Sequence, residues 1–270
     1  TTTTVNLGAA LAELGQKVLL VDLDPQGGLT LSCGFQPDTL EKTVYDAIRE
    51  GGVSEDLILS TSFGVDLLPA NIDLALAEME LINMVARERR IGAILTTIRD
   101  SYDFVLLDSQ PSLGLLTINA LAAADQAIIP IACEFLALRG VEALLKLVHR
   151  VQGQLNSQLR IMGFLPTMFD RRTNHAQNVL DEIAKRFSHE APVFEHVVYR
   201  SIRFPESSQN GKPIIYYSAA IAGADAYRGL AREILLRHGE SAVIDVAETA
   251  AASEKPTSIV DRIKSKFTLH

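Results

Sequence analysis

The sequence has few of the residues from which several kinds of functional site are built. Its two cysteines, Cys33 and Cys133, lie far apart, which excludes a disulfide framework and a Cys-x-x-Cys metal site and leaves buried free thiols as the expectation. The six histidines are scattered without an HExxH motif, and no G-x-S-x-G serine follows an expected strand. No run of about 18 apolar residues is present, so no transmembrane helix is predicted. We therefore expect a cytoplasmic protein without zinc-hydrolase or serine-hydrolase chemistry.

The remaining composition is that of a globular protein. Of 270 residues, 47% are apolar, 21% charged and 6% aromatic, values that exclude a disordered or fibrous chain. The formal net charge of −8 means that the molecule as a whole repels nucleic acid and anionic membrane. Binding to either would therefore require a local basic patch.

Short apolar runs alternate with helical periods along most of the chain. Runs of continuous apolarity are typical of strands buried on both faces. They predict strands over residues 17–22, 65–68, 104–108, 127–131 and 161–165. Helical periods predict helices over residues 5–14, 72–90, 114–123, 141–151, 174–187 and 224–237. The alternation predicts a doubly wound, mostly parallel α/β sheet with helices on both faces, in one domain over residues 1–238.

Candidate functional residues follow from this architecture, because ligands bind beyond the carboxyl ends of parallel strands. Asp22 and Asp24 lie at the end of the first expected strand, and Asp108 ends the third. Four threonines at the start of the chain lead directly into a helix, where hydroxyl and N–H groups can bind Mg²⁺ and phosphate. The same residues also fit a helix-capping cluster, a strand-end cap at Asp108 and a simple Asp-Pro turn at Asp24.

Five segments, in this order, resemble the ParA/Soj family of partition ATPases, the deviant Walker A branch of the P-loop NTPases. Residues 1–12 (TTTTVNLGAALA) resemble the helix that follows the family's phosphate loop, and residues 18–27 (VLLVDLDPQG) resemble its next strand and switch I. Residues 102–114 (YDFVLLDSQPSLG) are similar to its Walker B strand and switch II. The likeness continues in residues 166–174 and in residues 200–206 with 211–213, and so covers the chain to about residue 237.

The resemblance implies ATP hydrolysis with Mg²⁺. Thr1 would bind Mg²⁺ and the nucleotide, Thr2 would contact phosphate, and Asp108 would hold Mg²⁺ through water. Asp24 would position the attacking water, and Asp22 would support Mg²⁺ or the loop. The family's first strand, phosphate loop and two signature lysines would precede Thr1 in the intact protein.

Further nucleotide contacts are implied in two other segments. Pro111 lies in the expected switch II, where Gln110 replaces the first of the family's usual two prolines. Pro166, Thr167 and Met168 match the stretch that contacts adenine, although Pro166 also fits a strand end and Met168 a core position.

Partners are implied as well. Members of the family bind DNA non-specifically as ATP-bound sandwich dimers, through basic residues of the C-terminal half. Residues 196–237 carry six basic and three acidic side chains in an otherwise acidic chain. The candidate DNA contacts are Arg200, Arg203, Lys212 and Arg228. The alternative is a solvated helix face with ion pairs. We expect a nucleoid-associated homodimer for chromosome or plasmid segregation, with slow hydrolysis stimulated by a ParB-like partner.

Two alternatives concern the C-terminal residues and the activity. The composition predicts a flexible linker over residues 239–258 and a short amphipathic tail over residues 259–270. The tail is similar in kind to the membrane-targeting helix of MinD, a relative of ParA, but it also fits a frayed terminal helix. A nucleotide-gated scaffold with little turnover is the second alternative. The motif over residues 166–174 favours the partition branch over MinD.

Overall fold

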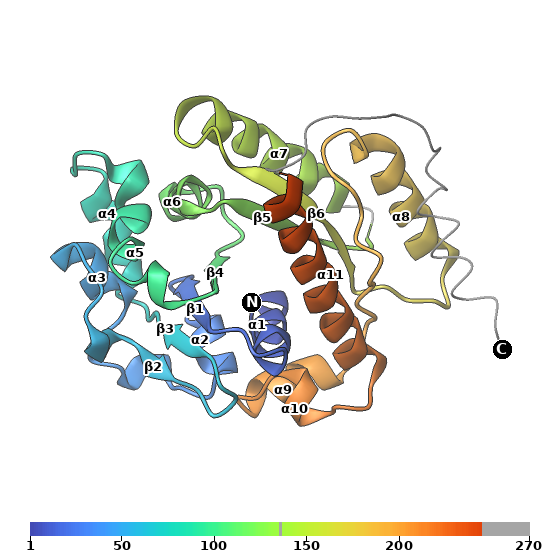
Figure 1. Cartoon of the computed structure of the whole chain (residues 1–270), viewed down its shortest axis with the longest axis horizontal. Helices are drawn as coiled ribbons and strands as arrows, with labels where there is room; N and C mark the ends of the chain where they lie inside the picture. Colours follow the sequence, from blue (N-terminus) through green and yellow to red (C-terminus); the bar gives the residue numbers. More distant parts are fainter. Residues whose placement is uncertain (135–136, 245–270) are drawn as a thin grey trace.

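The computed structural model describes residues 1–134 and 137–244. Helices and short strands alternate in this part, and the strands lie between layers of helices (Figure 1). The strands are β1 (Val18–Leu23), β2 (Leu59–Ser60), β3 (Asp66–Leu68), β4 (Phe104–Ser109), β5 (Gln126–Ala132) and β6 (Arg160–Thr167). The helices are α1 (Thr2–Glu13), α2 (Gly28–Ser32), α3 (Val44–Glu50), α4 (Leu74–Leu81), α5 (Arg90–Leu95), α6 (Leu115–Ala123), α7 (Ala137–Gln154), α8 (Asn174–Phe187), α9 (Arg203–Gln209), α10 (Ile214–Tyr217) and α11 (Ala222–Ile244).

The strands form two sheets. The first has the order β2-β3-β1-β4, in which β1 pairs in parallel with β3 and β4 while β2 runs antiparallel to β3. The second is the parallel pair β5 and β6. The mostly parallel α/β fold is confirmed, but the single sheet expected from the sequence is divided in two.

A cavity of about 680 Å³ lies between β4 and β5 and separates the two sheets. Both strands line it, together with the first turns of α1 and side chains from β6 and α11. Four of the six residues of β4 are only partly buried, whereas all six of β1 are buried. The sheet is thus divided because β4 and β5 lie on opposite sides of this cavity.

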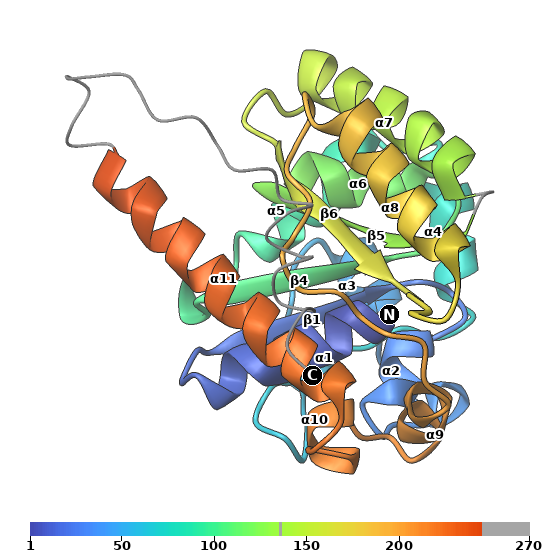
Figure 2. The same ribbon diagram turned by 90° about the vertical axis from the view of Figure 1, so that its right-hand side faces the viewer.

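The core explains why β1 is apolar except at Asp22. Val18 and Leu20 pack toward α1, α10 and α11, and Leu19 and Val21 pack toward α3, α4, α5 and α6. Successive side chains of a strand point to opposite faces, so a strand covered on both faces has no polar side. Figure 2 shows α11 running beside α1 in the first of these layers.

Two expected boundaries are wrong. The helix expected over residues 72–90 ends at Leu81 and a new one begins at Arg90, because the chain turns at Ala86, whose φ of 54° is left-handed. Helix α11 continues to Ile244, six residues into the expected linker, since residues 239–244 contain no proline to stop it. The rest of the linker and the tail over residues 259–270 lie outside the described residues. No helix in the described part is long and apolar enough to cross a membrane.

A buried asparagine joins α1 to α10. Asn6 is 1% exposed, donates from Nδ2 to the Thr2 carbonyl at 2.7 Å and accepts from the Ile214 N–H at 2.6 Å. Asn6→Ala should therefore lower the free energy of unfolding by about 1–3 kcal/mol, because the Ile214 N–H loses its acceptor. Urea denaturation measures this. Asn210→Ala, which removes an exposed bond to the Glu206 carbonyl, is the control and should cost less; equal losses would contradict the role of Asn6.

Candidate functional site

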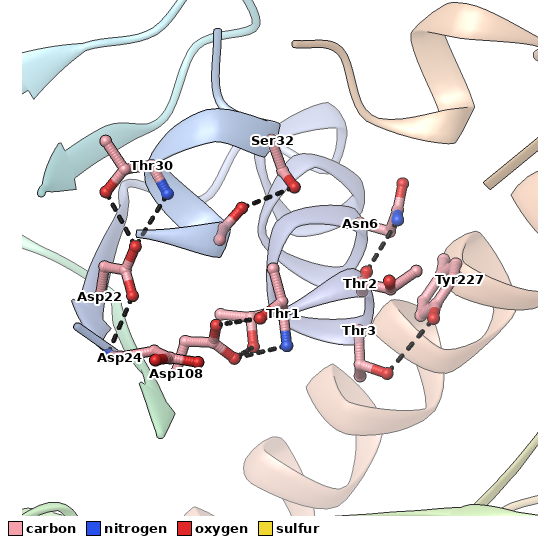
Figure 3. Close-up of polar contacts among 12 residues, drawn as sticks. Thr1, Thr2, Thr3, Asn6, Asp22, Asp24, Thr30, Ser32, Asp108 and Tyr227 are labelled. Atoms are coloured by element: carbon pink, nitrogen blue, oxygen red, sulfur yellow. Dashed lines mark hydrogen bonds and ion pairs between the residues drawn. The ribbon is translucent and has the colours of Figure 1, made fainter. Parts of the chain in front are cut away.

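The carboxyl ends of β1 and β4 meet the N-terminus of α1 (Figure 3). Asp22 of β1 and Asp108 of β4 are partners in the parallel register, so their side chains leave the sheet at the same edge. Gly28, the first residue of α2, lies so near that a Cβ there would be 3.6 Å from Thr1 Oγ1. Thr1, Asp22, Asp24 and Asp108, which the sequence predicts as site residues, therefore lie together.

Asp108 is held by hydroxyl groups of α1. Thr1 Oγ1 donates to its Oδ2 at 2.7 Å, and Thr4 Oγ1 donates to its Oδ1 at 2.8 Å. The Asp108 residue is only 4% exposed. Thr4 was not predicted from the sequence as a site residue. Residues three apart share a helix face, so its spacing from Thr1 could have identified it.

Asp22 is turned into the protein. Its Oδ2 accepts from the Thr30 N–H at 2.9 Å and from Thr30 Oγ1 at 2.8 Å, and its Oδ1 accepts from the Asp24 N–H at 3.1 Å. Burial raises the pKa of Asp22 to about 6, and the nearby Asp108 contributes in the same direction. Of the two roles that the resemblance implies, these contacts favour support of the loop.

Thr30 connects this loop to a third element. Besides donating to Asp22, its Oγ1 accepts from the Ala70 N–H at 3.0 Å, in the segment between β3 and α4. Thr30 is fully buried. No local signal in the sequence identifies it, because its partners lie eight and forty residues away.

Thr30→Val keeps the volume and shape of the side chain but removes both hydroxyl bonds. The free energy of unfolding should fall by about 2–3 kcal/mol, because the buried Ala70 N–H loses its acceptor and Asp22 loses a donor. Chemical denaturation measures the loss. In the control, Thr39→Val removes an exposed hydroxyl bond to the Gln36 carbonyl and should change stability by less than about 0.5 kcal/mol. If Thr30→Val lost no more stability than Thr39→Val, the proposed role of Thr30 in connecting Asp22 to Ala70 would be contradicted.

Asp24 lies at the rim of the site. Its Oδ1 accepts from the Gln26 N–H at 2.9 Å, and the side chain is neither fully buried nor fully exposed. The following turn reaches α2 through Gly27, whose φ of 62° is left-handed. The Asp-Pro turn that the sequence allowed is thus present, and it holds a carboxylate at the edge of the site.

The donors at this site fit Mg²⁺. They are the hydroxyls of Thr1 and Thr4 and the Asp108 carboxylate, all hard oxygen ligands. Within residues 1–134 and 137–244, no three His, Cys, Asp or Glu side chains form a metal cluster. Two hydroxyls and one carboxylate suit Mg²⁺, which is usually bound through one or two carboxylates together with substrate phosphates.

The other predicted nucleotide contacts lie farther along the chain. Thr2 is exposed at the start of α1, and Pro111 is exposed in the loop after β4. Pro166 is buried within β6, Thr167 ends that strand, and Met168 follows with a left-handed φ of 53° and 45% exposure. Within the described part, no hydrogen bond joins residues 166–168 to Thr1 or Asp108. Their contact with adenine stays a prediction.

The predicted DNA contacts differ in their surroundings. Arg200, Arg203 and Lys212 are exposed, and Arg203 pairs with Glu206 at 2.8 Å. The Arg228 side chain is only 24% exposed and forms hydrogen bonds to both carboxylate oxygens of Glu13 and to the Ala219 carbonyl. These contacts join α11 to α1, so we assign Arg228 a structural role. The sequence allowed either a DNA contact or a helix face with ion pairs, and for Arg228 the structure shows the ion pair.

The two cysteines are buried free thiols, as expected. Burial raises the pKa of Cys33 and raises that of Cys133 to about 11. Because a thiolate is the reactive form, neither cysteine is suited to act as a nucleophile at neutral pH.

Comparison with known proteins identifies the family. A family model described as an AAA domain matches residues 1–161. The sporulation initiation inhibitor protein Soj of Bacillus subtilis is 44% identical over 235 residues, covering 87% of this chain and 92% of that protein. The chromosome-partitioning ATPase Soj of Treponema pallidum is 42% identical over 242 residues, covering 89% and 93%.

A solved structure described as cobyrinic acid a,c-diamide synthase from Mycobacterium smegmatis, with bound ADP and magnesium, has a similar fold and sequence. It is 40% identical with a TM-score of 0.78, covering 89% of this chain and 90% of that chain. The chain belongs to the Soj/ParA family of chromosome-partitioning ATPases.

Proposed function

We propose that this partition ATPase closes into a homodimer when it binds ATP, that the dimer binds nucleoid DNA without sequence preference, and that hydrolysis releases it. Hydrolysis is slow by itself and is stimulated by a ParB-like partner. The observation that carries the proposal is the position of Asp108, bound to the first turn of α1 beside the loop that carries Asp24. This arrangement supports a site in which the proposed metal, phosphate and water-positioning groups would act together.

Each group has a defined part in the proposed reaction. The first N–H groups of α1 lack acceptors within the helix and favour the phosphates of the nucleotide. Thr1 and Asp108 would hold Mg²⁺, which would supply charge neutralisation during phosphoryl transfer. Asp24 accepts a hydrogen bond from the attacking water and orients it. Asp22 and Thr30 keep the Asp24 loop in place.

Phosphate release by the intact protein tests the function. It should be slow with ATP and Mg²⁺ alone and should rise when DNA and the N-terminal peptide of a ParB-like partner are added together. Turnover that stays undetectable under all these conditions would support the nucleotide-gated scaffold instead. Nucleotide-dependent binding to anionic vesicles, lost on removal of residues 259–270, would support the MinD-like alternative.

The exposed basic residues make a prediction for DNA binding. Arg200→Ala should weaken binding to DNA of any sequence and reduce the slope of log affinity against log salt concentration by about one, because one phosphate contact is lost. Fluorescence anisotropy at several salt concentrations measures both quantities. Arg99→Ala, at an exposed arginine in the segment before β4, is the control and should leave both unchanged. An unchanged salt slope for Arg200→Ala would place the DNA surface elsewhere.

A further inference from the structure

The loop between β4 and α6 is attached at both of its ends to one side chain of α4. Glu78 Oε1 accepts from Gln110 Nε2 at 3.2 Å and from the Leu116 N–H at 3.4 Å. Gln110 begins the loop that follows β4 and its Asp108, and Leu116 lies in the first turn of α6. One carboxylate oxygen thus holds the two ends of the loop, and we call this contact the Glu78 clip.

The clip supplies the cap that α6 lacks in its own sequence. The N-cap residue of α6 is Gly114, which has no side chain to accept from the first N–H groups of the helix. Glu78 accepts from one of these groups instead, and the helix dipole also favours a carboxylate at this end. A Cβ at residue 114 would lie 2.7 Å from Glu78 Oε1, so a side chain there would push the carboxylate out of this position.

Gln110 is the residue at which this chain departs from the family pattern, since the family usually has a second proline there. A proline has no side-chain donor, so the half of the clip made by Gln110 depends on this departure. Thr117 of α6 also holds the loop, because its Oγ1 donates to the Ser112 carbonyl at 2.6 Å. Residues 111–113, between these attachments, are exposed.

Helix α4 is attached to the other loop of the site as well. The segment before α4 contains Ala70, whose N–H donates to Thr30 Oγ1. Thr30 in turn donates to Asp22, which accepts from the Asp24 N–H. Helices α3, α4, α5 and α6 share one apolar core and lie together on one side of the molecule (Figure 1). Helix α4 therefore connects the loop that carries Asp24 with the loop that follows Asp108.

The position of Asp108 relative to Asp24 matters for the proposed reaction. Asp108 would hold Mg²⁺ and Asp24 would orient the attacking water, and a displacement of about 1 Å between reacting groups can cost about a hundredfold in rate. Asp108 lies one residue before the end of β4, so the loop that follows influences the path of the chain at this point.

We propose that Glu78 is a positioning residue for ATP hydrolysis, which holds the loop after Asp108 against α4 through Gln110 and the first turn of α6. The inference rests on the proposed function, because it assumes the roles given there to Asp24 and Asp108. It goes beyond that function by assigning the spacing of the two loops to a contact outside the site.

Phosphate release by variants of α4 tests the role of Glu78. Glu78→Ala should lower kcat by about tenfold or more and change the affinity for a fluorescent ATP analogue by less than about twofold, because the loop moves while the first turn of α1 is untouched. Glu78→Gln keeps an acceptor oxygen for both donors and should recover most of the rate. Glu80→Ala is the matched control on the same helix. Glu80 accepts from the Tyr45 hydroxyl of α3 at 2.9 Å, and its loss should leave kcat unchanged.

A double-mutant cycle separates the clip from a general loss of packing. Gln110→Ala should lower kcat in the wild-type protein and have little further effect in Glu78→Ala, because both substitutions remove the same hydrogen bond. Effects of the two substitutions that multiply independently would show that Gln110 and Glu78 do not act together, and would overturn the inference.

The loop can also be followed without catalysis. The sequence has no tryptophan, so Leu113→Trp, at a position that is 48% exposed within the loop, introduces a single tryptophan as a reporter. With Mg²⁺ and ADP present, acrylamide quenching of this reporter should be stronger and its anisotropy lower when Glu78→Ala is added, and unchanged when Glu80→Ala is added. Equal quenching and anisotropy in all three proteins would overturn the inference.

Failure of the inference is distinguishable from failure of the proposed function. If the wild-type protein binds ATP but shows no turnover with DNA and the partner peptide, the proposed function fails, and the tryptophan reporter still tests the clip. If the wild type turns over ATP and Glu78→Ala does so at the same rate, or if Glu80→Ala lowers kcat equally, the inference fails and the proposed function stands.

Discussion

Asp24→Ala is expected to lower the rate of ATP hydrolysis by about 10²–10⁴-fold while nucleotide binding is retained. A positioned carboxylate that accepts a hydrogen bond from the attacking water contributes about this much to a rate. Asp24 lies at the rim of the site, whereas the predicted metal and phosphate groups are Thr1, Asp108 and the first turn of α1. Phosphate release under saturating ATP, together with titration of a fluorescent ATP analogue, measures the two properties separately.

Asp24→Asn distinguishes the charge of this residue from its effect on the loop. The asparagine oxygen can still accept from the Gln26 N–H, so the turn keeps its shape. We expect Asp24→Asn to be nearly as slow as Asp24→Ala, because the amide is a poor proton acceptor. Asp38→Ala, which removes an exposed carboxylate in the following segment, should hydrolyse ATP at the wild-type rate. Near-normal turnover of Asp24→Asn would show that Asp24 acts through the loop alone.

Gly211→Ala is expected to lower the free energy of unfolding by about 2–5 kcal/mol. Gly211 has a left-handed φ of 59°, which costs other residues about 1–2 kcal/mol, and a Cβ there would lie 2.4 Å from the Cα of Gly34. Both partners are backbone, so relief of the contact requires the segments to separate, at an additional cost of about 1–3 kcal/mol. Gly34 follows α2 and Gly211 precedes α10, and the substitution therefore separates the region around the site from the C-terminal segment.

Gly15→Ala is the matched control for this prediction. Gly15 also has a left-handed φ, of 82°, but no atom lies within 4 Å of the position of its Cβ. Gly15→Ala should lower the free energy of unfolding only by the cost of the left-handed backbone. The difference between the two variants in chemical denaturation therefore measures the close approach of Gly34 and Gly211. Equal losses for Gly15→Ala and Gly211→Ala would contradict that approach.

The strand order along the chain and the site edge could be predicted from local sequence. A continuous apolar run ending in an aspartate identified both Asp22 and Asp108, because burial on both faces makes such strands apolar and parallel strands end at a common edge. Thr1 was identified by its place at the start of a helix. The helix boundary near residue 82 was not predicted, because the turn at Ala86 interrupts an apolar period without glycine or proline.

The roles of single side chains depended on contacts between distant segments. Asp22 and Asp24 have the same chemistry and lie two residues apart, yet Asp22 is buried against Thr30 while Asp24 lies at the rim. Arg228 counted as one of six basic residues in its segment, and only the fold places it against Glu13.

The sequence by itself determined the α/β class and the family and predicted the metal and phosphate residues, because these depend on short runs whose pattern is local. The tertiary structure decided which carboxylate supports the loop and which arginine is structural. Each of these depends on side chains brought together from segments tens to hundreds of residues apart. Hydrogen bonding, burial and ion pairing act over a few ångströms, so only the folded chain sets these distances.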